Sequence, residues 1–394
     1  MALPKGFVAT GIHSGIKRVN KDLLLIVSEL PAVGAGVFTT NIVRAAPVNI
    51  SERHIKNGGN IRAIVCNSGN ANACTGEQGE KDAVRMAEEM AKNFNLSAEE
   101  VIVSSTGVIG QNLPIEKIAT GIMAAKETLC QTGSSDAARA IMTTDTFPKA
   151  YSVDVELASG KTVKIWGIAK GSGMICPNMA TMLAFVTTDA QIEQSVLQEA
   201  LREANAYSFN CITVDGDTST NDMVIVMANG ASGAEQIEIA SENYQRFLAG
   251  LQHVLTVLSK LIVLDGEGAT KFIEITIDGA QTEEDAFKAA RTVANSNLFK
   301  TAINGEDANW GRIIAAMGRS GASFKPDLVE ISFNGLPILK PNYQVVFSEE
   351  AAKKALEPRV INVGIRVGEG SGSATVWTCD FSEVYVHING SYRS

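Results

Sequence analysis

Short apolar runs that are rich in β-branched residues recur along the chain, and they restrict the class of fold open to it. A run of this length and composition is typical of a buried strand. The runs predict strands that begin at Leu23, Ile61 and Val101, and a hairpin in which 151–156 pairs with 162–168. Later strands are predicted at 223–227, 272–277, 329–333, 360–367, 375–378 and 384–388.

Segments whose apolar residues recur at helical spacing lie between these runs. This spacing predicts helices at 81–94 and 247–264, a helix through Ala204 that is capped by Asp189, and one that is capped by Thr282 and ends at Asn295. Helices and strands are interspersed without a regular βαβ repeat. We therefore expect an α+β fold, a layered αββα sandwich, rather than a doubly wound parallel sheet.

Charge and composition exclude several classes of protein. The 394 residues are 45% hydrophobic, which is too apolar for a disordered chain, and the net charge of −9 without a basic run argues against a nucleic-acid partner. The apolar stretch 247–264 contains Lys260 and predicts a buried helix, not a membrane span. No secretory signal precedes the six cysteines, so we expect a cytoplasmic protein with free thiols.

Metal binding has little support in the sequence. The four histidines are far apart and form no HxxxH or HxH pair, so no metal site is expected. Asp215 and Asp217 flank a glycine, but the spacing of an EF-hand loop is absent. We interpret these two carboxylates as part of a turn network.

The stretch 170–183, KGSGMICPNMATML, carries the chemistry that the sequence suggests. Two glycines and a Pro-Asn turn form a loop that presents Thr181 at the start of a buried strand. A threonine hydroxyl in that position can attack the preceding carbonyl, and an N→O acyl shift with hydrolysis would cut the chain between Ala180 and Thr181. The released α-amine, whose ordinary pKa is about 7.7–8.0, can then serve as base for the hydroxyl. On residue types alone, a threonine that merely begins a strand is the commoner case.

The same stretch resembles the signature of the ornithine acetyltransferase family (ArgJ; glutamate N-acetyltransferase). The resemblance continues in order through 67–73, 105–110, 142–146, 215–222, 265–271, 304–312 and 388–394, so it spans the whole chain. It implies a sandwich of the self-processing DmpA/ArgJ-like type with an active site like that of N-terminal nucleophile enzymes. It also implies cleavage into an α chain, 1–180, and a β chain, 181–394, that assemble as an α₂β₂ heterotetramer.

The resemblance assigns a role to each candidate residue. It implies that Thr181 is the nucleophile and that Thr106 and Gly107, at a predicted strand end, form the oxyanion hole. Without it, these two residues read as a plain strand-to-turn exit. Residues implied to bind substrate, besides Thr181, are Thr144, Lys170, Glu267, Asn389 and Ser394.

Most of the substrate-binding residues also have a plainer interpretation from sequence. Lys170 is either a partner for a substrate carboxylate or a solvated surface lysine. Glu267 is either a ligand for a substrate amino group or an exposed turn carboxylate, and Thr144 is either a substrate contact or a turn hydroxyl. Ser394 stands where the family often has threonine and keeps the hydroxyl.

The implied reaction belongs to arginine biosynthesis. The acetyl group of N2-acetyl-L-ornithine passes to L-glutamate through an acetyl-threonine, without a cofactor, and acetyl-CoA is a second donor in some relatives of this kind. Two alternatives remain at this stage. A self-processing aminopeptidase or amidase would use water as the acceptor, and a non-catalytic binding protein would stay uncleaved.

Overall fold

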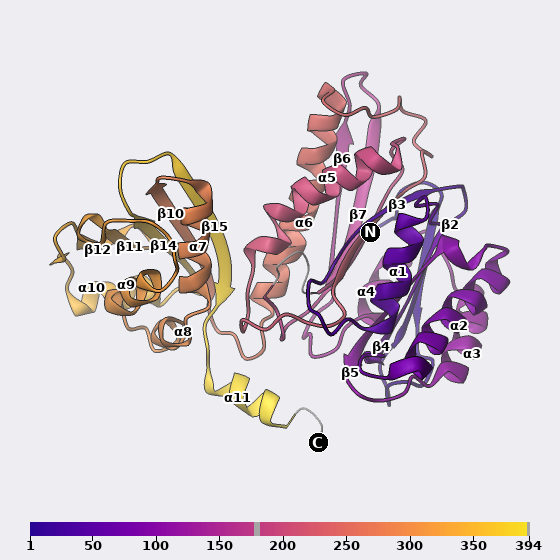
Figure 1. Cartoon of the computed structure of the whole chain (residues 1–394), viewed down its shortest axis with the longest axis horizontal. Coiled ribbons are helices and arrows are strands. Elements are labelled where there is room, and N and C mark those ends of the chain that lie inside the picture. The colour runs from indigo at the N-terminus through magenta and orange to yellow at the C-terminus, as the bar shows by residue number, and fades with distance from the viewer. Residues whose placement is uncertain (177–181, 392–394) are drawn as a thin grey trace. The chain divides into compact units, whose positions relative to one another are not determined.

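The computed structural model describes residues 1–176 and 182–391, and the chain divides into two compact units. Unit 1 comprises Met1–Gly171, Cys176–Asn210 and Asp217–Ile262. Unit 2 comprises Ser172–Ile175, Cys211–Gly216 and Val263–Ser394. Each unit is described separately (Figure 1).

Unit 1 contains two sheets. The first has the order β1-β2-β4-β5, with β1 (Phe7–Ile12), β2 (Leu23–Ser28), β4 (Ala63–Asn70) and β5 (Val101–Val108). The second has the order β3-β9-β8-β7-β6, with β3 (Val33–Phe38), β9 (Met223–Ala228), β8 (Leu183–Thr188), β7 (Thr162–Lys170) and β6 (Lys149–Glu156). The pairs β4–β5 and β8–β9 are parallel and the other pairs are antiparallel.

Helices cover the outer faces of both sheets (Figure 1). On the first sheet, α2 (Gly76–Phe94) and α3 (Ile115–Lys126) pack their apolar sides against residues such as Leu25 and Val65. On the second, α6 (Glu242–Leu264) places Val254 and Leu258 against Gly167, and α5 (Gln194–Ala206) contacts β3. Residues of both sheets share a buried core between them, to which α1 (Ala46–Lys56) and α4 (Ser134–Ala140) also contribute. The predicted αββα sandwich is confirmed for this unit.

Burial on two sides explains the continuous apolar runs in the sequence. All six residues of β2 are buried: Leu23 and Leu25 face the helices, while Leu24 and Ile26 face the other sheet. Side chains alternate along a strand, so a strand covered on both faces needs apolar residues at every position. The run that begins at Leu23 satisfies this need.

Unit 2 is a six-stranded sheet of order β13-β12-β11-β14-β10-β15 that is covered by helices. Its strands are β10 (Phe272–Ala280), β11 (Glu330–Phe333), β12 (Leu336–Lys340), β13 (Gln344–Val345), β14 (Val360–Arg366) and β15 (Gly372–Cys379). Its helices include α7 (Glu283–Ala294), α8 (Asn297–Asn304), α9 (Trp310–Gly318), α10 (Glu349–Leu356) and α11 (Glu383–Gly390). Three short 3₁₀ turns complete the described elements of the chain, at Ala98–Glu100, Phe209–Cys211 and Pro326–Leu328.

Two local predictions are wrong and one cap is confirmed. The run 384–388 is helical, as α11, because its side chains are largely exposed and it pairs with no strand among the described residues. The ring of Tyr385 in this helix lies 4.6 Å from that of Phe381, which precedes the helix. Asp189 does not cap α5, since its carboxylate accepts the backbone N–H groups of Lys5 and Lys164. The hydroxyl of Thr282 caps α7, as predicted.

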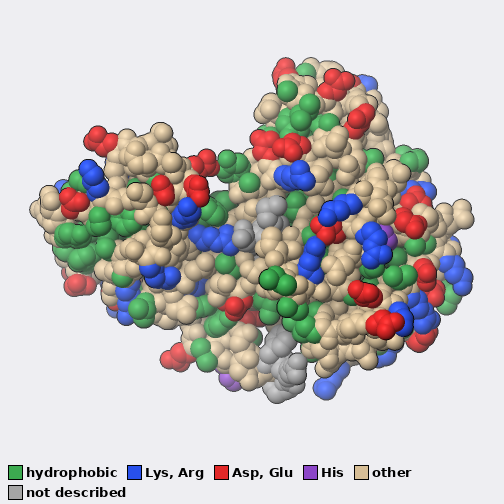
Figure 2. Space-filling model, in the orientation of Figure 1, with side chains coloured by type: hydrophobic (Ala, Val, Ile, Leu, Met, Phe, Trp, Pro, Cys, Tyr) green, Lys and Arg blue, Asp and Glu red, His purple; other side chains and the backbone are tan. Residues whose placement is uncertain are grey.

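Helix α6 and the surface charges concern two classes that the sequence argued against, membrane proteins and nucleic-acid-binding proteins. Among the described residues, α6 is long and apolar enough to cross a membrane, but half of its most apolar window is buried inside the protein, as in a core helix. Figure 2 shows acidic and basic side chains interspersed over the face that it draws.

Candidate active site

The predicted nucleophile lies outside the described residues, as do Ala180 and Ser394, whereas the chain from Met182 onward is described as far as Ser391. Met182 is buried, and its carbonyl accepts the N–H of Met223 at 3.0 Å. Strand β8 then begins at Leu183, in the centre of the five-stranded sheet of unit 1. The residue bonded directly to Thr181 is thereby anchored at one end of that sheet.

The proposed oxyanion residues end strand β5. Gly107 pairs with Gly69 of β4, and its φ of +135° suits glycine alone. A Cβ at Gly107 would lie 2.3 Å from the carbonyl carbon of Gly69, so a side chain cannot be accommodated there. Thr106 is 8% exposed. The predicted strand end is confirmed, and its backbone requires glycine at the position that would donate an N–H.

Lys170 and the loop that carries Thr144 are brought together by Asp145. One oxygen of Asp145 accepts the Lys149 ammonium at 2.7 Å and the Gly171 N–H at 2.8 Å, and the other accepts the N–H of Thr143 at 2.9 Å. These bonds tie the loop before β6 to the turn that follows Lys170. Lys170 is 8% exposed, so the interpretation as a solvated surface lysine is wrong.

The electrostatics of this cluster favour an ionised Asp145. Burial alone would raise the pKa of its carboxyl, but Lys170, Lys149 and the Gly171 N–H outweigh burial and lower that pKa to about 2. Lys170 pairs in register with Leu183, so its ammonium belongs to the same strand end as Met182. The buried Lys170 therefore lies beside the start of β8, the strand that follows the predicted nucleophile in the sequence.

Asn221 and Asp222 form part of the same strand end, although the sequence assigned them no role. The amide of Asn221 donates to the carbonyls of Ala71 at 2.6 Å and Ser105 at 2.9 Å, which ties the start of β9 to the end of β5. Burial raises the pKa of Asp222 well above its usual value, against the opposing effects of Ser219 and Lys170. Within the described part of the chain, Oδ2 of Asp222 has no hydrogen-bond partner. The sequence signal that could have drawn attention to these two residues is the polar run 215–222, which leads directly into the buried strand β9.

Unit 2 brings Glu267 and Asn389 together. The Asn389 amide donates to Oε2 of Glu267 at 2.8 Å, and the Glu267 N–H donates to the carbonyl of Ser172. A Cβ at Gly173 would lie 2.5 Å from the Glu267 carboxyl carbon, so glycine at 173 permits this approach. Glu267 is 6% exposed, which rules out the exposed turn carboxylate.

Asp215 holds the same short segment in place. Its carboxylate accepts the N–H groups of Met174 and Ile175 at 2.6 and 2.9 Å, and the hydroxyl of Tyr385 donates to it at 3.2 Å. This arrangement confirms a turn network at Asp215. Within residues 1–176 and 182–391, no three His, Cys, Asp or Glu side chains are grouped to hold a metal ion.

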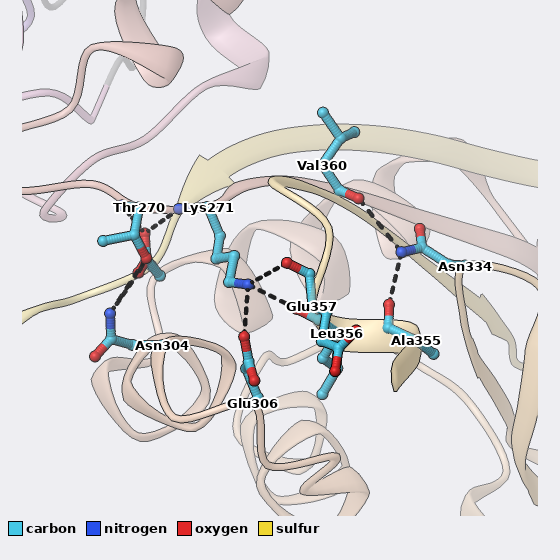
Figure 3. A network of polar contacts seen from close by, with 10 residues as sticks. Thr270, Lys271, Asn304, Glu306, Asn334, Ala355, Leu356, Glu357 and Val360 are labelled. Atoms are coloured by element: carbon cyan, nitrogen blue, oxygen red, sulfur yellow. Dashed lines mark hydrogen bonds and ion pairs between the residues drawn. The ribbon is translucent and has the colours of Figure 1, made fainter. Parts of the chain in front are cut away.

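Two other motifs interlock with each other inside unit 2 (Figure 3). The ammonium of Lys271 donates to Glu306 and to the carbonyls of Leu356 and Glu357. Asp380 accepts the N–H groups of Thr270 and Lys271 at 2.8 Å, and the amide of Asn304 donates to it at 2.7 Å. The motifs 265–271 and 304–312 thus stabilise the fold around Glu267.

Comparisons with known proteins agree along the whole chain. The ArgJ family profile matches residues 8–394. A protein of Chlorobaculum tepidum named arginine biosynthesis bifunctional protein ArgJ is 57% identical over 99% of this chain and 96% of its own, and the Bacillus subtilis protein of that name is 49% identical over the same shares. A crystal structure of the Bacillus halodurans protein of that name matches with a TM-score of 0.52 and 43% identity, over 54% of this chain and 100% of the solved one.

The buried cluster around Asp145 makes stability depend on pH. We expect Asp145→Asn to lower the free energy of unfolding at pH 7 by at least ~2 kcal/mol, because the wild-type pKa is lowered from 3.8 to about 2 and Lys149 loses its partner. This loss of stability is complete above pH 3.8, the ordinary pKa of the carboxyl. It shrinks as the pH falls from 3.8 through 2, because the wild-type carboxyl then also becomes neutral. Urea unfolding from pH 7 to pH 2 measures it.

The control for that experiment is Asp136→Asn, which removes an exposed ion pair with Lys21 and should cost less than ~1 kcal/mol. A deficit for Asp145→Asn that stays constant from pH 4 to pH 2 would show that charge at Asp145 is not the cause.

Proposed function

The chain belongs to the ArgJ family and is an acetyltransferase of arginine biosynthesis, and from this premise we propose that Thr181 carries the acetyl group of N2-acetyl-L-ornithine to L-glutamate. The observation that carries the proposal is the buried Lys170 ammonium beside the residue that follows Thr181. Both substrates are amino acids with an α-carboxylate. A buried cation at that point suits the feature they share.

The proposed mechanism is a double displacement. The α-amine of Thr181 takes the proton of its own hydroxyl, and Oγ attacks the acetyl carbonyl of the donor. Thr106 and the Gly107 N–H stabilise the tetrahedral oxyanion, and ornithine leaves with the proton. The amine of glutamate then attacks the carbonyl of the acetyl-threonine and gives up a proton to the Thr181 α-amine. The C–Oγ bond breaks, Oγ takes that proton back, and N-acetylglutamate leaves.

The remaining site residues orient the substrate. We assign Lys170 to the α-carboxylate and Thr144 to the same substrate end, because Asp145 fixes both to one strand end. We assign Glu267 and Asn389, which hydrogen-bond each other, to the substrate amino group, with Ser394 as a further contact. No cofactor is required, and acetyl-CoA is a second donor in the proposal, in keeping with the name bifunctional that relatives bear.

Self-cleavage between Ala180 and Thr181 would generate the α-amine. The cut gives chains of 180 and 214 residues, and 214 of 394 is 54%, the share of this chain that the solved Bacillus halodurans chain matches over its full length. This agreement supports the proposed boundary. We further propose an α₂β₂ assembly in the cytoplasm.

The hydrolase alternative has less support. An aminopeptidase or amidase of related fold would deliver the acyl group to water, whereas the whole-length relatives are named for arginine biosynthesis. A non-catalytic binding protein is likewise excluded by membership in an enzyme family.

The covalent intermediate provides the direct test of function. Incubation with N-acetylornithine without glutamate should raise the mass of the 181–394 fragment by one acetyl group, and subsequent glutamate should remove it. Intact-mass spectrometry measures the adduct, and steady-state rates should fit a ping-pong scheme. Intersecting initial-rate lines without an adduct would exclude double displacement.

Maturation is tested by Thr181→Ala. The wild type should run as two fragments in denaturing electrophoresis, with N-terminal sequencing of the larger starting at Thr181, while the variant stays whole because it lacks the attacking hydroxyl. Thr187→Ala is the matched control, since Thr187 is a buried threonine of β8, the strand that begins at Leu183. Efficient cleavage of Thr181→Ala would contradict self-processing.

Kinetics should separate Thr106 from Lys170. Thr106→Ala should lower kcat about 10²–10³-fold with a smaller change in KM, because its hydrogen bond strengthens as charge develops on the oxyanion. Lys170→Met should raise KM for N-acetylornithine and glutamate together, with a smaller fall in kcat. Both variants are assayed as cleaved protein or as co-expressed fragments. The opposite split of effects would reverse the two assignments.

A further inference from the structure

Lys17 lies in a loop of unit 1 that is held rigidly between β1 and β2. The carboxylate of Asp22, which is fully buried, accepts the N–H groups of Ser14 at 2.6 Å and Lys17 at 2.9 Å, and also that of Gly15. Hydrogen bonds to a buried carboxylate fix the backbone of this loop. The position of Lys17 is therefore set by the backbone on both sides of it.

The side chain of Lys17 crosses the strand end that carries the oxyanion residues. A Cβ at Gly69 would lie 3.1 Å from its Cγ, and Gly69 is the strand partner of Gly107. Its ammonium donates to the carbonyl of Met142 at 2.5 Å and to that of Lys21 at 3.2 Å. Lys17 thus lies between the oxyanion strand and the loop that carries Thr144. An ammonium has three N–H donors, and the described residues occupy two of those of Lys17, which leaves one for a ligand.

Charged groups of both signs lie around Lys17, whose own ammonium is largely buried. Burial lowers the pKa of Lys17, and the charge of Lys170 lowers it further, while Asp22 and Asp145 act in the opposite direction. Asp145 is already bonded to Lys149, and Asp22 to the backbone of its own loop. Such a cluster gains stability from anionic groups of a ligand.

Two cations that interact with each other, Lys17 beside the ends of β4 and β5 and Lys170 at the end of β7, match a substrate with two carboxylates. We propose that Lys17 is a specificity-determining residue that binds the side-chain carboxylate of glutamate while Lys170 binds its α-carboxylate. The proposal rests on the proposed acetyl transfer. Ornithine ends in an ammonium and gains no ion pair with Lys17, so the residue favours glutamate as acceptor over an uncharged or cationic amino acid.

The test compares glutamate with glutamine, which has nearly the same shape but no side-chain charge. In the wild type, kcat/KM should favour glutamate by roughly 100-fold, and Lys17→Met should reduce this preference at least about tenfold through KM for glutamate. KM for N-acetylornithine should change less than about threefold. Lys17→Gln, which keeps a donor for the Met142 carbonyl but lacks charge, should behave in the same way and covers a folding failure of the methionine variant.

Lys21→Met is the matched control, because Lys21 lies in the same loop but its ammonium donates to Gly11 and pairs with Asp136. It should retain the preference for glutamate. A Lys17 variant that keeps the preference, or that raises KM for both substrates equally, would overturn the proposal and leave Lys17 as a support of the Thr144 loop. Absence of acetyl transfer in the wild type would instead refute the proposed function.

Discussion

The buried carboxylate of Asp145 determines how the strand ends of unit 1 are organised. It binds one lysine side chain and two backbone N–H groups that come from the loop before β6 and from the turn after β7. Transferring a carboxylate from water to the protein interior costs several kcal/mol unless its oxygens are fully paired. Because Asp145 is paired in this way, the loop with Thr144 and the turn after Lys170 occupy fixed positions. The proposed substrate contacts of Thr144 and Lys170 depend on this one ionised group.

Much of the fold was predictable because local pattern and tertiary burial agree in it. The run at Leu23 is apolar at every position since both faces of β2 are covered, and Thr282 caps α7 as its spacing with Asp285 indicated. The run 384–388 misled the prediction because β-branched residues alone do not make a strand. A strand needs a neighbouring strand, and that exposed segment has none within the described residues.

The candidate site was predictable only in part. Resemblance pointed to Thr106, Lys170 and Glu267, and the structure places each at a buried position. It gave no role to Lys17 or to Asp222. The ammonium of Lys17, for example, bonds to the carbonyl of Met142, which is 125 residues away in the sequence. Side chains that act through such long-range contacts leave no periodic trace in a sequence. Their roles emerge from burial and charge once the fold is known.

The central position of β8 has a consequence for the life of the protein. Its neighbour β7 precedes the proposed cut, whereas β9 follows it, so both fragments contribute strands to one sheet. A cut chain keeps these ladders, but once unfolded its two pieces can rebuild the sheet only by a concentration-dependent encounter, not by closing a short connection. The uncut connection would therefore help the two halves to fold together only once, before the chain is cleaved. After the cut, the enzyme would stay folded because it unfolds slowly, and denaturation followed by dilution would be irreversible in practice.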